Sequence, residues 1–514
     1  MKRRSSDFVF QLIQAMTKSE KRQFKLYSGR LEANNTAKFV LLFDVLDKQR
    51  EYDERQIIHH VGVKKQQLSN LKAHLYKQIL ISLRLNPAHQ DTTQHLHEQL
   101  DYARILYSKG LYRQSLKILE KAKQLAIKRQ RPTIAFQLVD LEKLIETQFV
   151  HKEVGSRTSK LIDQSKSLSH TNDILARLSD LATELQSMML ESGYAKNNTA
   201  FSKLEAYYEE RFPKLNYSEL GFLEKISWLR VQISYNSLIQ DFLGMYKYAK
   251  RWISLFDDHP LMVGEHPVYF LMGHQHFFDA SFFLKQKTQF NERLIKLDQL
   301  VKKKVFSKDK NLVTLYFLCK TQAQLNLCFL DGSFSVGKRL IPEILYGIKQ
   351  NKERLNPHQL MVLYYKLACL HFALEQYDAC IDYLNRIIEN KTLRVHQDLL
   401  CFSRVLSLIA HYESGRDYAI EAQIKSTYKF LLRMDELQQV QQEMIRFLRK
   451  LPDLYPTELK AALRTLHAQF LAFEQDPFER RAFLYLDFLS WLEAKIYDKS
   501  IATVIQEKAK PLVR

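Results

Sequence analysis

A short pattern of small, turn-forming and aromatic residues recurs along this chain and constrains its fold more than any other feature. Its clearest copy is Ala103, Gly110, Tyr112, Ser115 and Ala122. Small side chains let the backbones of two antiparallel helices approach, and the aromatic ring fills the space that remains between them. Glycine tolerates the positive φ of a tight turn. The pattern therefore predicts a helical hairpin that turns at Gly110.

The same register returns further along the chain, more clearly in some copies than in others. The turn positions that it predicts are Gly244, Thr288, Gly332, Glu375 and Asp417, which are 42 to 44 residues apart. One hairpin cannot bury its apolar face alone, so hairpins that recur at a fixed period must stack on one another. We therefore expect an α-solenoid of stacked antiparallel helix hairpins with a period of about 44 residues.

The composition agrees with an all-α fold. The chain has only 13 glycines and 11 prolines among its 514 residues, fewer than an average protein of this length. So few turn-forming residues imply long helices with short connections. Apolar residues also recur at spacings of three and four rather than two, which indicates helices and not strands.

At the residues of this pattern the sequence resembles the tetratricopeptide-repeat (TPR) family, which carries small, glycine, aromatic and small residues in this order across a helix pair. The copies that match best are Ala103/Gly110/Tyr112/Ser115/Ala122 and Ala368/Tyr377/Cys380/Leu384. The period is longer than the family's repeat of about 34 residues, so the resemblance implies longer helices. It also implies a non-catalytic interaction scaffold with a concave binding surface, and we carry over no ligand-clamp residues from it.

Breaks in the pattern suggest four segments. Residues 1–90 form a helical N-terminal module, 91–257 a first TPR-like half-array, 258–450 a second half-array, and 451–514 a C-terminal helical cap. The segment 257–267 is the longest loop that we expect, and it is a candidate hinge between the half-arrays.

The chain is strongly basic, with a formal net charge of +20 and a pI near 9.4. Such a balance favours acidic partners, such as RNA, DNA, an anionic membrane face or an acidic protein. The five cysteines form no CxxC pair and fall in apolar helical stretches, so we expect buried, reduced thiols. With no signal peptide and no apolar run long enough to span a membrane, a cytoplasmic location is expected.

Two basic segments are candidate binding sites. In the helix expected over residues 113–131, the cations lie within one narrow sector, opposite the apolar side. A second basic segment spans residues 285–310. Both segments are either solvated faces or sites for nucleic acid or an acidic partner. The candidate residues are Arg113, Lys117, Lys121, Lys128, Lys285, Lys287, Lys302, Lys303 and Lys304.

Residues 53–85 have the outline of a DNA-binding helix-turn-helix. We expect a short helix that Asp53 caps and that ends at Gly62, followed by a long basic helix from Lys64 to Leu85. The hairpins of a solenoid have the same outline, so a structural N-terminal cap is the other interpretation.

Two other motifs resemble functional sites but are better explained by the predicted helical structure. Residues 332–338 match a phosphate-binding loop up to Lys338, but Arg339 stands where a serine or threonine should bind magnesium, and the repeat register already explains Gly332 and Gly337. His274 and His276 are two residues apart and point to different faces of a helix, so we predict no metal site. We also expect no cofactor and no catalytic residues.

The leading expectation for function is therefore a non-catalytic cytoplasmic scaffold or adaptor that binds a protein or peptide partner in its concave groove. The alternative is a basic protein that binds RNA or a ribonucleoprotein, or that binds DNA through residues 53–85. The oligomeric state does not follow from the sequence.

Overall fold

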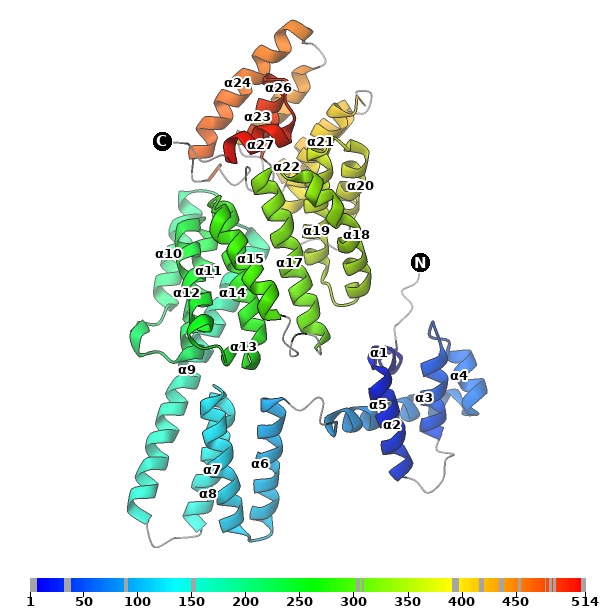
Figure 1. Cartoon of the computed structure of the whole chain (residues 1–514), viewed down its shortest axis with the longest axis vertical. Coiled ribbons are helices and arrows are strands. Elements are labelled where there is room, and N and C mark those ends of the chain that lie inside the picture. The colour runs from blue at the N-terminus through cyan, green and yellow to red at the C-terminus, as the bar shows by residue number, and fades with distance from the viewer. Residues whose placement is uncertain are drawn as a thin grey trace. The chain divides into compact units, whose positions relative to one another are not determined.

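A computed structural model shows that the described part of the chain is helical and contains no strand (Figure 1). This confirms the prediction of an all-α fold. The description leaves out residues 1–6, 32–37, 87–90, 149–153, 302–305, 307–308, 391–396, 416–419, 434–438, 452–453, 477, 480–482, 484–486 and 510–514.

The chain divides into two compact units, Met1–Leu168 and Ser169–Arg514. Unit 1 has one core within its first five helices and a second core among the helices that follow. Its helices are α1 (Phe8–Ala15), α2 (Lys18–Leu31), α3 (Lys38–Lys48), α4 (Glu54–Val61), α5 (Lys65–Arg84), α6 (Thr92–Ser108), α7 (Tyr112–Lys128) and α8 (Pro132–Gln148). The division falls inside the long helix α9 (Val154–Ser192). The segment boundaries expected at 90, 257 and 450 remain predictions.

Unit 2 is a longer succession of helices. They are α10 (Asn198–Arg211), the short 3₁₀ helix η2 (Tyr217–Glu219), α11 (Phe222–Leu238), α12 (Phe242–Asp258), α13 (Met262–Glu265), α14 (Pro267–Phe283), α15 (Lys287–Val301), α17 (Lys310–Asp331), α18 (Phe334–Asn351), α19 (Pro357–Ala373), α20 (Tyr377–Ile388), α21 (Gln397–Glu413), α22 (Ile420–Arg433), α23 (Gln439–Lys450), α24 (Pro456–Gln475), α26 (Phe488–Ile496) and α27 (Ile501–Ala509).

The hairpin turns share one backbone motif. At the turn between α6 and α7, Gly110 has a left-handed φ of 73°, and the N–H of Leu111 donates to the carbonyl of Leu106, five residues earlier, at 2.9 Å. This is the Schellman motif, which satisfies carbonyls that would be unpaired at a helix end. The left-handed residues of the equivalent turns are Gln130, Gln240, Lys285, Gly332, Glu375 and Asp498. The turns predicted at Gly110, Gly332 and Glu375 are therefore confirmed.

The prediction of a turn at Gly244 is wrong. Gly244 lies in the first turn of α12, and the left-handed residue is Gln240. Gln240 stands two positions before Phe242, and Gly244 stands two positions before Tyr246. The sequence pattern therefore fits both positions, and Gly244 lies about one helical turn after the true turn. Gly244 has another role, because a Cβ there would lie 2.2 Å from the side-chain oxygen of Asn236.

Three further expectations also need correction or lie outside the described residues. Thr288 is inside α15, because its hairpin turns at Lys285, and Asp417 is not described. The segment 257–267 is no long loop, because α12 extends to Asp258, α14 begins at Pro267, and the short helix α13 lies between them.

Small residues bring packed helices together, both within a hairpin and between hairpins. Ala103 and Ser115 are fully buried between the two helices of the α6–α7 hairpin, as the pattern predicts, and the Ser115 hydroxyl donates to the Ala103 carbonyl at 2.8 Å. Between two consecutive hairpins of unit 2, Gly273 of α14 lies against the fully buried indole ring of Trp252 on α12. Such contacts set the distance between the helix backbones, because the interior has no room for a larger side chain.

Consecutive hairpins of unit 2 pack on one another. The first helices α14, α17, α19 and α21 contact in that order, and each second helix packs against the first helix of the next hairpin. Near the C-terminus this order changes, because α27 returns to the turn between α17 and α18. There the side chain of Gln506 donates to the Gly332 carbonyl at 3.2 Å.

The five cysteines are free and buried, which confirms that prediction. Burial raises the pKa of the Cys369 thiol to about 12, so this thiol is uncharged near neutral pH. None of the described helices is long and apolar enough to cross a membrane.

We predict that Gly273→Ala lowers the melting temperature. The added Cβ would lie 2.6 Å from the Trp252 ring, and such overpacking costs about 1–3 kcal/mol. Gly264→Ala in α13 is the matched control, because its Cβ would meet no atom within 4 Å. Thermal unfolding followed by circular dichroism compares the two, and an unchanged melting temperature for Gly273→Ala would contradict this packing.

Candidate functional site

The predicted basic stripe of α7 is exposed. We call Arg113, Lys117, Lys121 and Lys128 the α7 stripe, and the structure places all four side chains in solvent on one side of the helix. None of the four makes an ion pair with another described residue. The opposite side of α7 carries Leu116, Leu119, Ala122 and Ala126, which are buried in the core with α6 and α8. The stripe is thus available to an anionic partner.

One cation of the same helix faces inward. Lys123 is only 4% exposed, and its ammonium group donates to the buried carboxylate of Glu142 on α8 at 2.8 Å. Arg157 of α9 approaches the other oxygen of Glu142 at 3.0 Å, and Glu120 pairs with Lys123 at 2.8 Å. A buried carboxylate therefore holds two cations from different helices.

The second basic segment is different, because its described cations pair with acids of the chain. Lys287 contacts Asp331 at 2.7 Å, and Lys285, in the α14–α15 turn, approaches Glu474 at 3.8 Å. Lys302, Lys303 and Lys304 lie outside the described residues. Lys285 and Lys287 are thus exposed like the α7 stripe, but they differ from it because each lies close to a carboxylate of the chain.

A group of polar side chains that the sequence did not reveal runs across three consecutive hairpins of unit 2. We call it the polar row: Gln275 and Asp279 of α14, Gln322 and Asn326 of α17, and Lys366 of α19. Gln275 donates to both oxygens of Asp279 at 3.0 Å and approaches the Gln322 carbonyl oxygen at 3.2 Å. The Lys366 ammonium donates to the Asn326 side-chain oxygen. Hydrogen bonds thus connect the first helices of successive hairpins.

Burial shifts the pKa values of the two ionisable side chains in the polar row. Burial raises the pKa of the Asp279 carboxyl, against the hydrogen bond from Gln275 and the charge of Lys366. Burial likewise lowers the pKa of the Lys366 ammonium, and Asp279 opposes that shift. The Lys366 ammonium also lies 5.6 Å from the centre of the Phe282 ring. The row therefore offers amide groups, one carboxyl and one amine in a partly apolar setting.

One of two histidines next to the polar row, His274, has hydrogen-bond partners at both ring nitrogens. The Nδ1 of His274 is 2.8 Å from the Phe270 carbonyl, and its Nε2 accepts a hydrogen bond from Arg293 at 3.1 Å. Both ring nitrogens are therefore occupied, and neither is free to bind a metal ion. Arg293 also makes a bidentate ion pair with Asp257 at 2.8 and 3.2 Å. No cluster of three metal-binding side chains occurs among the described residues.

Burial also changes the protonation of these rings. Burial and the charge of Arg293 lower the pKa of His274 to about 3. Burial and the charge of Arg230 lower the pKa of His276 to about 4. Both rings are therefore neutral near neutral pH.

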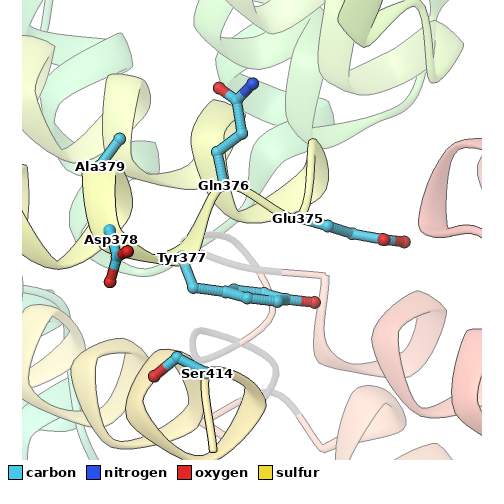
Figure 2. Close-up of a pocket in the computed structure, with 6 residues that line it drawn as sticks. All are labelled: Glu375, Gln376, Tyr377, Asp378, Ala379 and Ser414. Carbon is cyan, nitrogen blue, oxygen red and sulfur yellow. The ribbon is translucent and has the colours of Figure 1, made fainter.

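A shallow recess of about 510 Å³ lies at the turn between α19 and α20. Figure 2 shows its lining residues, which are Glu375, Gln376, Tyr377, Asp378, Ala379 and Ser414. Their side chains diverge, with Gln376 pointing away from the ring of Tyr377 (Figure 2). Because a ligand site needs polar groups that converge, we do not assign a function to this recess.

The segment that resembles a phosphate-binding loop has the structure of a hairpin. Gly332 ends α17 with a left-handed φ of 64°. Gly337 lies inside α18 and packs against Leu370 of α19. A phosphate loop must follow a strand, whereas this segment follows a helix. The hairpin geometry therefore accounts for both glycines, one at the turn and one at a close helix contact.

No known protein-family model matches the chain, and no curated protein matches it either. The fold itself defines the class at the level of architecture: an all-helical protein built largely from consecutively packed helices.

The α7 stripe could be predicted because its residues are close in sequence and follow the helical period. The polar row could not, because its residues belong to three helices and each looks like an ordinary polar position of a helix. A weak signal exists: Gln275 and Gln322, and likewise Asp279 and Asn326, are separated by 47 residues, the same interval as between the turn residues Lys285 and Gly332.

We predict that Glu142→Ala strongly destabilises unit 1. It leaves Lys123 buried without its main partner, and breaking a buried ion pair in this way costs about 3–5 kcal/mol. Glu120→Ala, which removes the more exposed partner of Lys123, is the control and should cost about 1 kcal/mol or less. Denaturant unfolding measures both variants. Equal effects would show that the buried pair adds nothing beyond the exposed one.

We also predict that unit 2 loses stability as the pH falls from 6.5 to 4. His274 and His276 stay neutral in the folded state, whereas unfolded histidine takes up a proton below pH 6.5, so acid favours unfolding. Each ring contributes a slope of up to about 1.4 kcal/mol per pH unit.

His274→Gln should flatten this slope, even if the variant is less stable at pH 7. The free energy of unfolding at pH 7, 6, 5 and 4 provides the measurement. The same slope in the variant and the original chain would rule out a contribution from His274.

Proposed function

We propose that this protein is a non-catalytic helical-repeat scaffold of TPR-like hairpins that binds an extended peptide segment of a protein partner. The polar row is the observation that carries this proposal. Its amides and its two ionisable groups belong to the first helices of three successive hairpins. In a stacked array those helices would line the concave side, so a peptide lying there would meet one set of polar groups per repeat.

The chemistry of the row suits a peptide backbone. The side-chain amides of Gln275 and Gln322 can each donate and accept hydrogen bonds. Lys366 can bind a carboxylate, and the Phe282 ring beside it can contact an apolar side chain. Displacing the hydrogen bonds within the row by equivalent bonds to a peptide would cost little, because each group would remain satisfied.

The spacing of the turns supports a repeat whose length varies. The left-handed residues Gln240, Lys285, Gly332 and Glu375 follow one another at intervals of 45, 47 and 43 residues. These intervals are longer than those of the TPR family, as we expect from the sequence. Longer helices would give each hairpin more surface for a partner.

The α7 stripe favours RNA binding as a second candidate function. Its four cations are exposed on one face, and the protein carries a net charge of +20. Binding through phosphates would weaken steeply with salt, by about 0.7 in log affinity per log salt for each neutralised phosphate of a single strand. Four contacts would give a slope near −3.

We predict that partner binding depends on the polar row. The full-length chain serves as bait in an extract of its host cell, in parallel with the Gln322→Ala/Lys366→Ala variant and the Lys117→Glu/Lys121→Glu variant. We expect one partner to be retained by the original chain and by the α7 variant, and to be reduced about tenfold or more by the polar-row variant, since two hydrogen-bonding groups are lost.

Circular dichroism first establishes that both variants fold. Retention that falls only slightly between 50 and 200 mM salt would agree with a peptide held mainly by the amides of the row, with one ion pair at Lys366. Loss of binding in the α7 variant alone, with a steep salt dependence, would reject the scaffold proposal in favour of RNA binding.

A further inference from the structure

A second candidate binding site lies in the first five helices of unit 1. We propose that α4, the turn at residues 62–64 and α5 form a helix-turn-helix that reads the major groove of duplex DNA. This inference does not depend on the scaffold function, because it uses different residues and a different unit of the protein.

The α4–α5 turn has the length and backbone of such a motif. Asp53 caps α4, and its carboxylate accepts the N–H of Arg55 at 2.9 Å. Gly62 then takes a left-handed φ of 64°, and α5 begins three residues later at Lys65. A three-residue turn that contains glycine is typical of helix-turn-helix proteins.

The arrangement of the two helices separates this motif from the repeat hairpins. In the hairpins α6–α7, α11–α12 and α19–α20, the two helices pack along their lengths. In contrast, α4 and α5 make little contact with each other beyond the turn, and each packs on α3. Figure 1 shows α1 to α5 in blue, with α5 running across α2. Helices that diverge from their turn leave one side of the second helix open.

The burial of the motif matches this geometry. Ile57, Val61, Val63, Leu68 and Leu75 are all buried in the core of the first five helices. They hold α4, the turn and the inner side of α5 together. The outer side of α5 is therefore fixed in position without contributing to the core.

The outer side of α5 carries the side chains that read base edges. Lys65, Gln66, Ser69 and Asn70 are exposed within its first two turns, and the small Ala73 follows on the same side. Glutamine and asparagine can pair with adenine through two hydrogen bonds, and lysine can bind guanine. The N-terminal part of a recognition helix is the part that contacts bases.

The charge of this module complements DNA. Residues 1–86 contain 17 Lys or Arg against 8 Asp or Glu. The first two turns of α5 expose no acid. Lys65 lies 3.5 Å from the carboxylate of Glu54 on α4, but the side chain of Lys65 is still 82% exposed. Arg55 at the start of α4 and Lys64 in the turn are both exposed and can contact phosphates.

The test is a selection of binding sites from a library of random 30-base-pair duplexes by the full-length chain at physiological salt. We expect one sequence motif to be enriched and to bind about a thousandfold more tightly than random duplex, at the low end of the range for specific DNA-binding proteins.

Gln66→Ala/Asn70→Ala should then reduce binding to the selected duplex about tenfold or more, and leave binding to random duplex unchanged. Lys117→Ala/Lys121→Ala on α7 is the matched control and should keep the sequence preference. Both variants change exposed side chains, and circular dichroism verifies their folding.

Three results would overturn the proposal. The first is a library in which no motif is enriched. The second is a sequence preference that survives the α5 substitutions. The third is tighter binding to single-stranded RNA of the selected sequence than to the duplex.

Discussion

The hairpins of this protein depend on single residues that adopt a left-handed conformation at the end of each first helix. That residue lets the next N–H return to a carbonyl five positions earlier, and the second helix starts almost at once. Glycine occupies the position at Gly110 and Gly332, but glutamine and glutamate do so at Gln240 and Glu375. The tertiary packing of two helices on each side of the turn evidently compensates for the strain of these larger residues.

Because the turns are so short, the two helices of a hairpin must lie close together, and their contact positions accept only small or well-fitting side chains. Ser115 satisfies its own hydroxyl within the α6–α7 interface, and between consecutive hairpins Gly273 of α14 likewise leaves space for the indole of Trp252 on α12. Stacking then brings the first helices of successive hairpins side by side. The polar row is a product of this geometry, since Gln275, Gln322 and Lys366 come together only when the helices are stacked.

Much of this architecture could be predicted from the sequence, and the exceptions have physical reasons. The all-α fold and the turn at Gly110 follow from periodicity and from one glycine. Gly244 misleads, because a glycine required for close approach looks the same in sequence as a glycine required for a turn. The exposure of Lys117 follows from its helical phase. The inward ion pair of Lys123 does not, because it needs Glu142 of the next helix.

The return of α27 to the turn at Gly332 has a consequence for the order of folding during synthesis. Gln506, which bonds to the Gly332 carbonyl, follows it by 174 residues. At a typical synthesis rate of about 5–20 residues per second, the α17–α18 turn leaves the ribosome roughly 10–35 seconds before its covering helix exists. During this interval the apolar surface that α27 later covers is open to chaperones, so the central hairpins reach their final packing only when α27 has been made.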